Sequence, residues 1–206
     1  MLLDAIRKGN AEEVRSLLAA DPSLYDTRTP EGASAVLWAV YTRHAELAPL
    51  LLGGREPDFY EACALGDSGR ARALLAANPA LRDAPAPDGF TALGLACFFR
   101  HAEVARLLLD SGADASLSSA NALRFSPLHS AVAADVFEIV DLLLERGADP
   151  NAVAADGNTP LHSAAGHGNR QVIARLLAAG ADRDARNQAG SSPADLARQH
   201  GKAVDW

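Results

Sequence analysis

The feature that most constrains the fold of this 206-residue chain is that its sequence repeats itself at two spacings. The run Arg-His-Ala-Glu at residues 43–46 recurs 57 residues later at residues 100–103. In the C-terminal half the spacing is 33 residues, because Ser126-Pro127-Leu128-His129 returns as Thr159-Pro160-Leu161-His162 and then as Ser192-Pro193. A regular spacing of this size predicts an array of stacked structural units.

Each unit contains the start and stop signals of two short helices. Thr159 is a good N-cap, and Pro160 fits the first helical position, where no backbone N–H is needed. This first helix is expected to end near Gly168. A second helix is expected from 170 to 179, with an apolar stripe along one face and a left-handed stop at Gly180. One unit therefore reads as turn, helix, turn, helix and extended loop.

Composition agrees with helices and excludes several classes of protein. The chain is 49% hydrophobic and rich in Ala and Leu, which favours helices over a β-sandwich and excludes disorder. No apolar stretch approaches the roughly 20 residues of a membrane span. The N-terminus shows no signal peptide, and two cysteines make no disulfide framework, so we expect a cytoplasmic location. A net charge of -7 argues against nucleic acid as a partner.

With these motifs in place, the chain resembles the ankyrin-repeat family. The resemblance is carried by the 33-residue period, by residues 156–165 (Asp-Gly-Asn-Thr-Pro-Leu-His-Ser-Ala-Ala), and by Gly-Ala-Asp at 180–182. The layout is similar to that of stand-alone bacterial ankyrin-repeat proteins. It implies an all-α solenoid in a single domain, 1–206, with β-hairpin-like finger loops. The expected helix pairs are 2–20, 31–53, 59–77, 88–112, 123–147, 156–180 and 189–203.

Departures from the family pattern predict local irregularities. The link between Leu52 and Phe59 is about ten residues shorter than a full finger, so its hairpin is expected to be absent. The link from Gly112 to Ser126 is two residues longer than in the next unit and is expected to bulge. Pro49 lies inside the second helix of the second unit and is expected to cause a kink or a shortened first turn. Trp206 is expected to be frayed or lightly packed.

The resemblance also implies which positions face a partner: the residue before each cap and the two residues after the Ala-Ala pair. Five of the eleven aromatic residues fall there, and exposed aromatics are typical of interface centres. An alternative interpretation is that some of these rings fill the gap left by the missing hairpin. The predicted partner-binding residues are Tyr41, Thr42, Phe90, Phe98, Phe99, Phe125 and His167.

The remaining polar residues favour structural roles. Cys63 and Cys97 are expected to be small buried apolar residues. The resemblance implies that His129 and His162 hold neighbouring loops together by hydrogen bonds. No His or Cys spacing matches a metal site, and no motif matches a catalytic elbow or a phosphate loop. Trp38 and Phe137 occupy semi-buried positions in the family, so both are expected to belong to the core. Acids at 135, 138, 141 and 145 indicate ion pairs with the next helix or, as an alternative, an acidic patch for a basic partner.

The sequence thus predicts a monomeric, non-catalytic protein-binding module that requires no cofactor. Its partner is an unidentified protein that the module scaffolds or inhibits, with neither nucleic acid nor membrane involved. A small-molecule or metal-responsive sensor is the alternative, using the aromatic-lined gap near the longer finger and His167.

Overall fold

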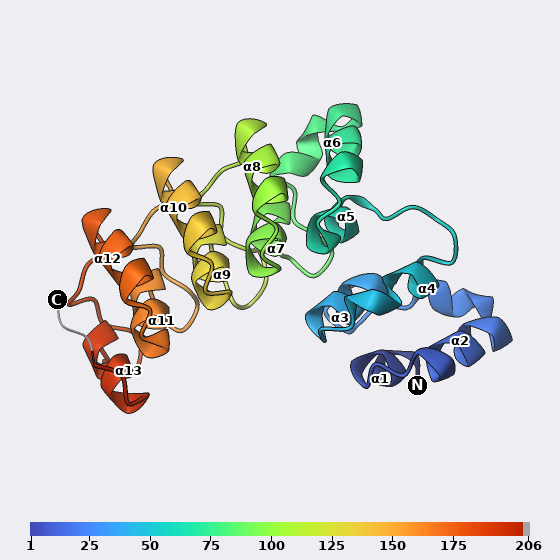
Figure 1. The fold of residues 1–206 in the computed structure, drawn as a ribbon, viewed down its shortest axis with the longest axis horizontal. Coiled ribbons are helices and arrows are strands. Elements are labelled where there is room, and N and C mark those ends of the chain that lie inside the picture. The colour runs from blue at the N-terminus through green and yellow to red at the C-terminus, as the bar shows by residue number, and fades with distance from the viewer. Residues whose placement is uncertain (204–206) are drawn as a thin grey trace.

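The computed structural model describes residues 1–203 and shows a curved row of short helices that follow one another in chain order (Figure 1). From α5 to α13 the first helices of the units line the inner side of the curve, and the second helices line the outer side (Figure 1). Thirteen α-helices and no extended strands lie within the described residues, which confirms the predicted all-α solenoid. Trp206 lies outside these residues.

The first six units are helix pairs, as predicted. Their helices are α1 (Leu2–Arg7), α2 (Ala11–Ala20), α3 (Ala35–Tyr41), α4 (Ala48–Leu52), α5 (Phe59–Leu65), α6 (Ser68–Ala77), α7 (Ala92–Phe98), α8 (Ala102–Asp110), α9 (Pro127–Ala133), α10 (Phe137–Glu145), α11 (Pro160–His167) and α12 (Arg170–Ala178). The seventh unit differs from its predicted pair over 189–203, because it contains only α13 (Pro193–Gln199) within the described residues. Gly201 adopts a left-handed φ of 66° and turns the chain out of the helix.

The helix boundaries follow from capping chemistry. Ser126 Oγ accepts the backbone N–H of His129, and Thr91 Oγ1 accepts that of Gly94. Thr159 occupies the predicted cap position of α11, where its hydroxyl contacts His162 Nδ1 and its backbone N–H donates to the same nitrogen at 3.1 Å. Gly168 ends α11 in the left-handed conformation, as the sequence indicated.

Pro49 shortens the second helix of its unit, as predicted. Residues Ala45–Leu47 form one 3-10 turn, and α4 begins only at Ala48, which places Pro49 in the first turn of the α-helix. A proline is tolerated there because its missing N–H would have no partner within the helix.

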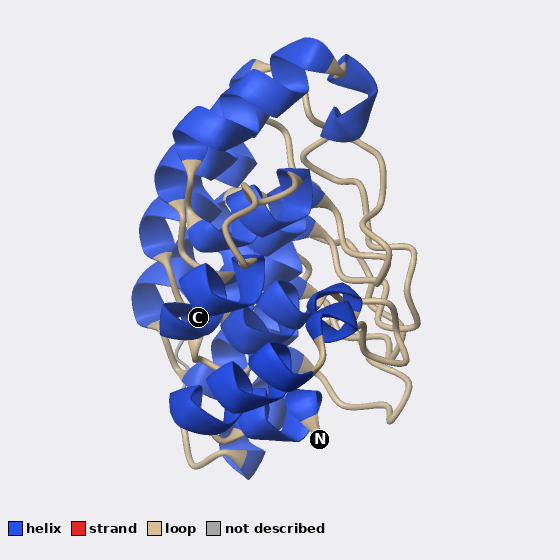
Figure 2. Cartoon of the chain, turned by 90° about the vertical axis from the view of Figure 1, so that its right-hand side faces the viewer, coloured by secondary structure: helices blue, strands red, loops and turns tan. Residues whose placement is uncertain are grey.

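The finger loops gather on one side of the helical layers (Figure 2). The regular fingers close with one backbone bond between residues four apart, for example Ala154 N–H to Asn158 C=O at 2.9 Å. The finger before α9 closes from Ser119 N–H to Phe125 C=O at 2.8 Å, six residues apart, which confirms the predicted two-residue bulge. Residues 53–58 form no hairpin, so the finger before α5 is missing as predicted.

The 57-residue period has a packing explanation. The imidazole of His44 rests against Gly9, and that of His101 rests against Gly66, so that a Cβ added at either glycine would lie within 2.6 Å of the ring. Both glycines also hold a positive φ in the turn between the helices of their unit. The pair glycine-then-histidine therefore alternates between successive units, and the sequence repeats every two units in this half of the chain.

The apolar core is continuous in the C-terminal units but divided near the N-terminus. One buried cluster joins the units from Phe59 to Leu176, and a second joins the first two units, from Leu2 to Leu51. A small third cluster around Leu37, Val40 and Leu95 lies between them. In the part of the chain that the structure describes, no helix is both long enough and apolar enough to cross a membrane.

Candidate functional site

The missing finger brings together two loops that belong to units two positions apart. The finger at residues 27–34 lies directly against the finger at residues 84–91, because a Cβ added at Gly32 would lie 2.7 Å from the carbonyl oxygen of Pro87. Across the same gap the Tyr41 hydroxyl donates to Asp88 Oδ2 at 2.8 Å. We call this region, from α3 to α7, the junction.

Aromatic rings fill part of the space that a finger would occupy. The Tyr41 ring centroid lies 5.4 Å from that of Phe99 and 6.1 Å from that of Phe90, and all three rings are half-buried. Burial, followed by the negative charge of Asp88, raises the pKa of the Tyr41 hydroxyl well above its ordinary value. This hydroxyl therefore remains a hydrogen-bond donor that ties α3 to the opposite finger.

Next to these rings lies an apolar groove of about 440 Å³. Its walls come from three fingers and from the first helices α3, α7 and α9. We name it the aromatic groove, and the residues that line it are Thr29, Glu31, Ala33, Trp38, Tyr41, Asp88, Phe90, Gly94, Leu95, Phe98, Asn121, Ala122, Leu123, Phe125 and Ser130. A largely apolar hollow with a few polar groups is typical of a binding site.

Two of the large apolar side chains that the protein exposes lie in this groove. Phe98 is 43% exposed and Leu123 is 48% exposed, the latter on the bulged finger. Val153, at 54%, is exposed outside the groove. Exposed apolar side chains gathered at one hollow favour an interaction surface over chance exposure.

The third residue of α7 is a glycine that lines the groove. In α9 and α11 that position holds His129 and His162, whereas Gly94 has no side chain, and a Cβ added there would lie 3.0 Å from Thr91 Oγ1 and 3.7 Å from Ser130 Oγ. Ser130, which is only 2% exposed, lines the bottom of the groove beside Gly94.

The structure separates the predicted partner-binding residues into two sets. Tyr41, Phe90, Phe98 and Phe125 line the aromatic groove, and the Phe125 ring stacks on His129 at 5.6 Å.

Phe99 does not line the aromatic groove: it packs within the junction, as the gap-filling interpretation predicted. Thr42 is not part of the groove either, because its hydroxyl donates to the backbone oxygen of Trp38 at 2.8 Å and closes the end of α3. His167 is exposed at the end of α11 and is not part of the groove.

Trp38 is half-buried and packs against the core of the first two units, as its family position implies. It also lines the groove, which was not expected, and its indole N–H donates to the Leu3 carbonyl at 2.9 Å. Leu123, Gly94 and Ser130 were missed as groove residues. The sequence did contain a signal for Gly94, because the aligned repeats place glycine where the units of α9 and α11 have histidine.

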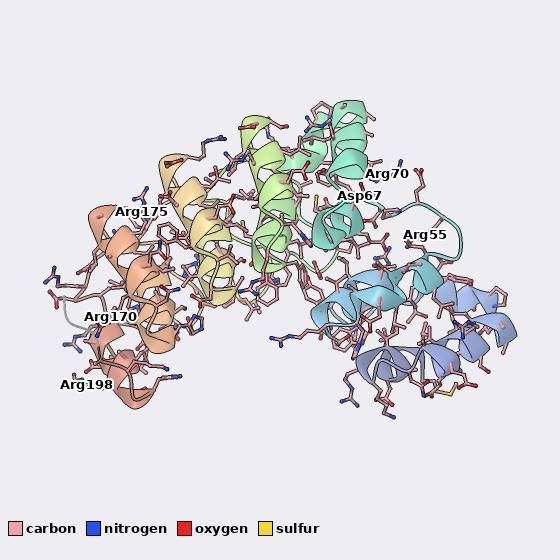
Figure 3. The ribbon with its side chains drawn as sticks, viewed as in Figure 1. Arg55, Asp67, Arg70, Arg170, Arg175 and Arg198 are labelled. Atoms are coloured by element: carbon pink, nitrogen blue, oxygen red, sulfur yellow. The ribbon has the colours of Figure 1, made fainter. Side chains whose placement is uncertain are left out.

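A buried carboxylate at the junction was also missed. Glu61, the third residue of α5, is fully buried and accepts hydrogen bonds from Ser34 Oγ at 2.7 Å, from Asp58 N at 2.9 Å, and from two nitrogens of Arg55. Arg55 comes from the short segment that replaces the finger (Figure 3). Burial raises the pKa of Glu61, but these hydrogen bonds outweigh it and hold the pKa below its ordinary value.

The histidines and cysteines have the predicted structural placements. His129 Nδ1 accepts the N–H of Ser126, so Nε2 carries the proton and donates to the Asn158 carbonyl of the next finger at 3.0 Å. Cys63 and Cys97 are free and buried, and burial raises the pKa of the Cys63 thiol to about 12. Within residues 1–203 no group of three or more His, Cys, Asp or Glu side chains is placed to hold a metal ion.

The architecture and the finger-lined groove define a helical-repeat solenoid of the kind that presents an extended binding face. Comparison with known proteins identifies the family, since a family model described as Ankyrin repeats (3 copies) matches residues 59–154 and 128–206. The chain belongs to the ankyrin-repeat family. Ankyrin repeats are non-enzymatic interaction modules that generally mediate protein–protein interactions.

Curated relatives share part of this chain. It is 42% identical over 87 residues to the Neurogenic locus Notch protein of Drosophila melanogaster, which covers 42% of this chain and 3% of the relative. It is 39% identical over 72 residues to an ankyrin repeat protein of the Acanthamoeba polyphaga mimivirus, and this match covers 35% of this chain and 9% of the relative. It is 38% identical over 71 residues to BCL-6 corepressor-like protein 1 of Homo sapiens, and this match covers 34% of this chain and 4% of the relative. The chain spans less than a tenth of the length of each of these relatives.

Proposed function

We propose that this chain is a non-catalytic protein-binding module that holds a partner protein in the aromatic groove. The observation that carries the proposal is the gathering of Trp38, Tyr41, Phe90, Phe98 and Phe125 around one apolar hollow at the junction. Aromatic side chains in a central, partly desolvated position supply most of the binding energy in many interfaces. The fingers and helices that carry them are fixed by packing, so docking costs little conformational entropy.

The proposal extends to the state of the molecule. The module works as a cytoplasmic monomer in which residues 1–206 form a single domain. It scaffolds or inhibits its partner by occupying a surface, and it needs no cofactor. The family assignment supports the binding of a protein partner, because ankyrin repeats typically bind proteins.

A paired variant tests the groove directly. Phe98→Ser with Leu123→Ser removes the two exposed apolar side chains of the groove, and Val153→Ser removes one of similar exposure elsewhere. In affinity capture from the native host, a partner should be retained by the wild type and by Val153→Ser and lost by the double variant. Capture that is equally strong with all three proteins would contradict the proposal. The melting temperature of each variant shows whether it is folded.

A small-molecule sensor is a second candidate, favoured by the size of the groove. Its volume of about 440 Å³ falls within the range of small-molecule sites. A low-molecular-weight compound that co-purifies with the wild type and is absent from the double variant, by native mass spectrometry, would favour this candidate. His167 has no part in it, because it lies outside the groove.

A further inference from the structure

A second hollow of about 490 Å³ adjoins the aromatic groove. Tyr41 and Phe98 line both hollows, so the two are continuous across these rings. The second hollow is lined by Val40, Tyr41, Arg43, Phe98, Phe99, Arg100, Ala133 and Ala134. We call it the arginine hollow, because its charged lining residues are two arginines and no acid.

The charges of the two hollows differ. In the aromatic groove, Asp88 is already occupied, since its carboxylate accepts the Tyr41 hydroxyl and the Phe90 N–H. Glu31 therefore remains as the exposed acid at that end. At the other end Arg43 is exposed and its guanidinium makes no hydrogen bond or ion pair with any described residue, and the guanidinium of Arg100 donates only to the Ala134 carbonyl. This end is positive on a chain whose net charge is -7.

The backbone under both arginines has an unusual conformation for this residue type. Arg43 and Arg100 have φ values of 65° and 70° in the turn between helices, the position that glycine holds at Gly9, Gly66 and Gly168. An L-residue such as arginine is disfavoured in the left-handed region, which glycine adopts freely. Asp135, with a φ of 56°, holds the equivalent turn of the next unit, and Arg124, with a φ of 52°, lies in the bulged finger, so the conformation is not confined to the two arginines of the hollow.

We propose that the partner presents a linear segment with one large apolar side chain and a carboxylate a few residues away. The apolar side chain enters the aromatic groove beside Phe98, and the carboxylate lies over Arg43 and Arg100. This inference rests on the proposed function and names the chemistry of the partner. An arginine guanidinium matches a carboxylate in charge and geometry. The continuous apolar lining of the aromatic groove matches the large apolar side chain of the partner.

Peptide selection tests the pattern with a defined probe. A library of random dodecapeptides displayed on phage is selected in parallel on the full-length wild type, on Phe98→Ser with Leu123→Ser, and on Arg43→Glu. Peptides selected on the wild type should combine a large apolar residue with Asp or Glu. They should weaken at least about tenfold on the groove double variant. On Arg43→Glu they should weaken about threefold to tenfold, a range expected for reversal of one partly exposed charge.

Two further variants guard against trivial results. Arg15→Glu makes the same charge change on the exposed face of α2, away from both hollows, and should leave affinity unchanged. Arg43→Gln removes the charge without adding a negative one and should weaken acidic peptides by a smaller factor. It keeps the test decisive where Arg43→Glu fails to fold.

The outcomes separate this inference from the proposed function. Peptides that lose binding on the groove variant but contain no acid, or are indifferent to Arg43→Glu and Arg43→Gln, overturn the inference and leave the proposed function standing. If selection yields no peptide that depends on Phe98 and Leu123, the inference fails. The host capture experiment then decides the proposed function independently. Binding of decanoate in place of any peptide, measured by calorimetry and lost on the groove variant, overturns the inference in favour of a small apolar acid.

Discussion

The third residue of the first helix behaves differently in the C-terminal units and at the junction. In α9 and α11 it is histidine, which binds its own cap residue and donates to the carbonyl of the next finger. In α3, α5 and α7 it is Leu37, Glu61 and Gly94. The regular histidine locks neighbouring units together, and its replacement leaves room for other contacts. In this array the regular units therefore supply stability, and the irregular units supply the candidate site.

The junction keeps its geometry by means that the regular units do not use. A buried carboxylate with four hydrogen bonds, a tyrosine bond between fingers, and a group of half-buried rings replace one missing finger. Each of these can be removed singly. Single variants can therefore test whether the junction depends on these replacements as strongly as the regular units depend on their histidines.

The largest effect is expected at Glu61. Replacement by alanine leaves the Ser34 hydroxyl, the Asp58 N–H and the Arg55 guanidinium without their acceptor and should lower the free energy of unfolding by about 2–3 kcal/mol. The partner Arg55 is 43% exposed, which keeps the loss below that of a fully buried pair. Urea unfolding followed by circular dichroism measures it. Glu56→Ala, at a carboxylate 72% exposed, is the matched control and should change stability by less than about 0.5 kcal/mol.

An intermediate effect should distinguish two adjacent rings. Phe99→Ser removes a ring that packs on Tyr41 inside the junction and should cost about 2 kcal/mol, less than a fully buried phenylalanine. Phe98→Ser removes a ring that is 43% exposed and should cost at most about 1 kcal/mol. Melting temperatures by differential scanning calorimetry compare them. Equal losses would show that both rings belong to one packed cluster and that Phe98 is not an available contact.

The smallest effect concerns pH and the regular units. Burial lowers the pKa of His129 and of His162 below their ordinary value, so the unfolded chain binds these protons more readily than the folded one. Their contribution to stability is complete above pH 6.5 and is lost as the pH falls below it. The melting temperature should therefore be lower at pH 5.5 than at pH 7.5.

The variant His129→Gln with His162→Gln tests the origin of this loss. It should be less stable at pH 7.5 than the wild type and should show a smaller decrease on acidification. A decrease of the same size in the variant would assign the pH dependence to other groups. Hydrogen exchange would show whether α9 and α11 lose protection between pH 7.5 and pH 5.5 while α5, which has Glu61 in place of the histidine, does not.

Much of the fold could be predicted from the sequence because its signals are local. The caps at Ser126 and Thr159, the left-handed stop at Gly168 and the proline at 49 act on the residues next to them, so a linear reading placed the helix boundaries well. The missing finger and the bulged finger were also predicted, because a change in the spacing of a repeat is visible without coordinates. The prediction of a helix pair in the seventh unit was wrong, because Gly201 turns the chain after α13 and no second helix begins in the described residues.

The sequence by itself determined that this chain is a row of ankyrin repeats, and it indicated which side of each unit faces outward. Only the tertiary structure decided which outward rings share a groove, because that depends on contacts between loops more than 50 residues apart. Without its finger, the α5 unit lets residues 27–34 meet residues 84–91, so Tyr41 and Phe99 become packed while Trp38 and Leu123 open onto the groove. The position of a residue in the repeat determines which side of its own unit the side chain faces. The exposed fraction of that side chain depends on how much of it the neighbouring units cover.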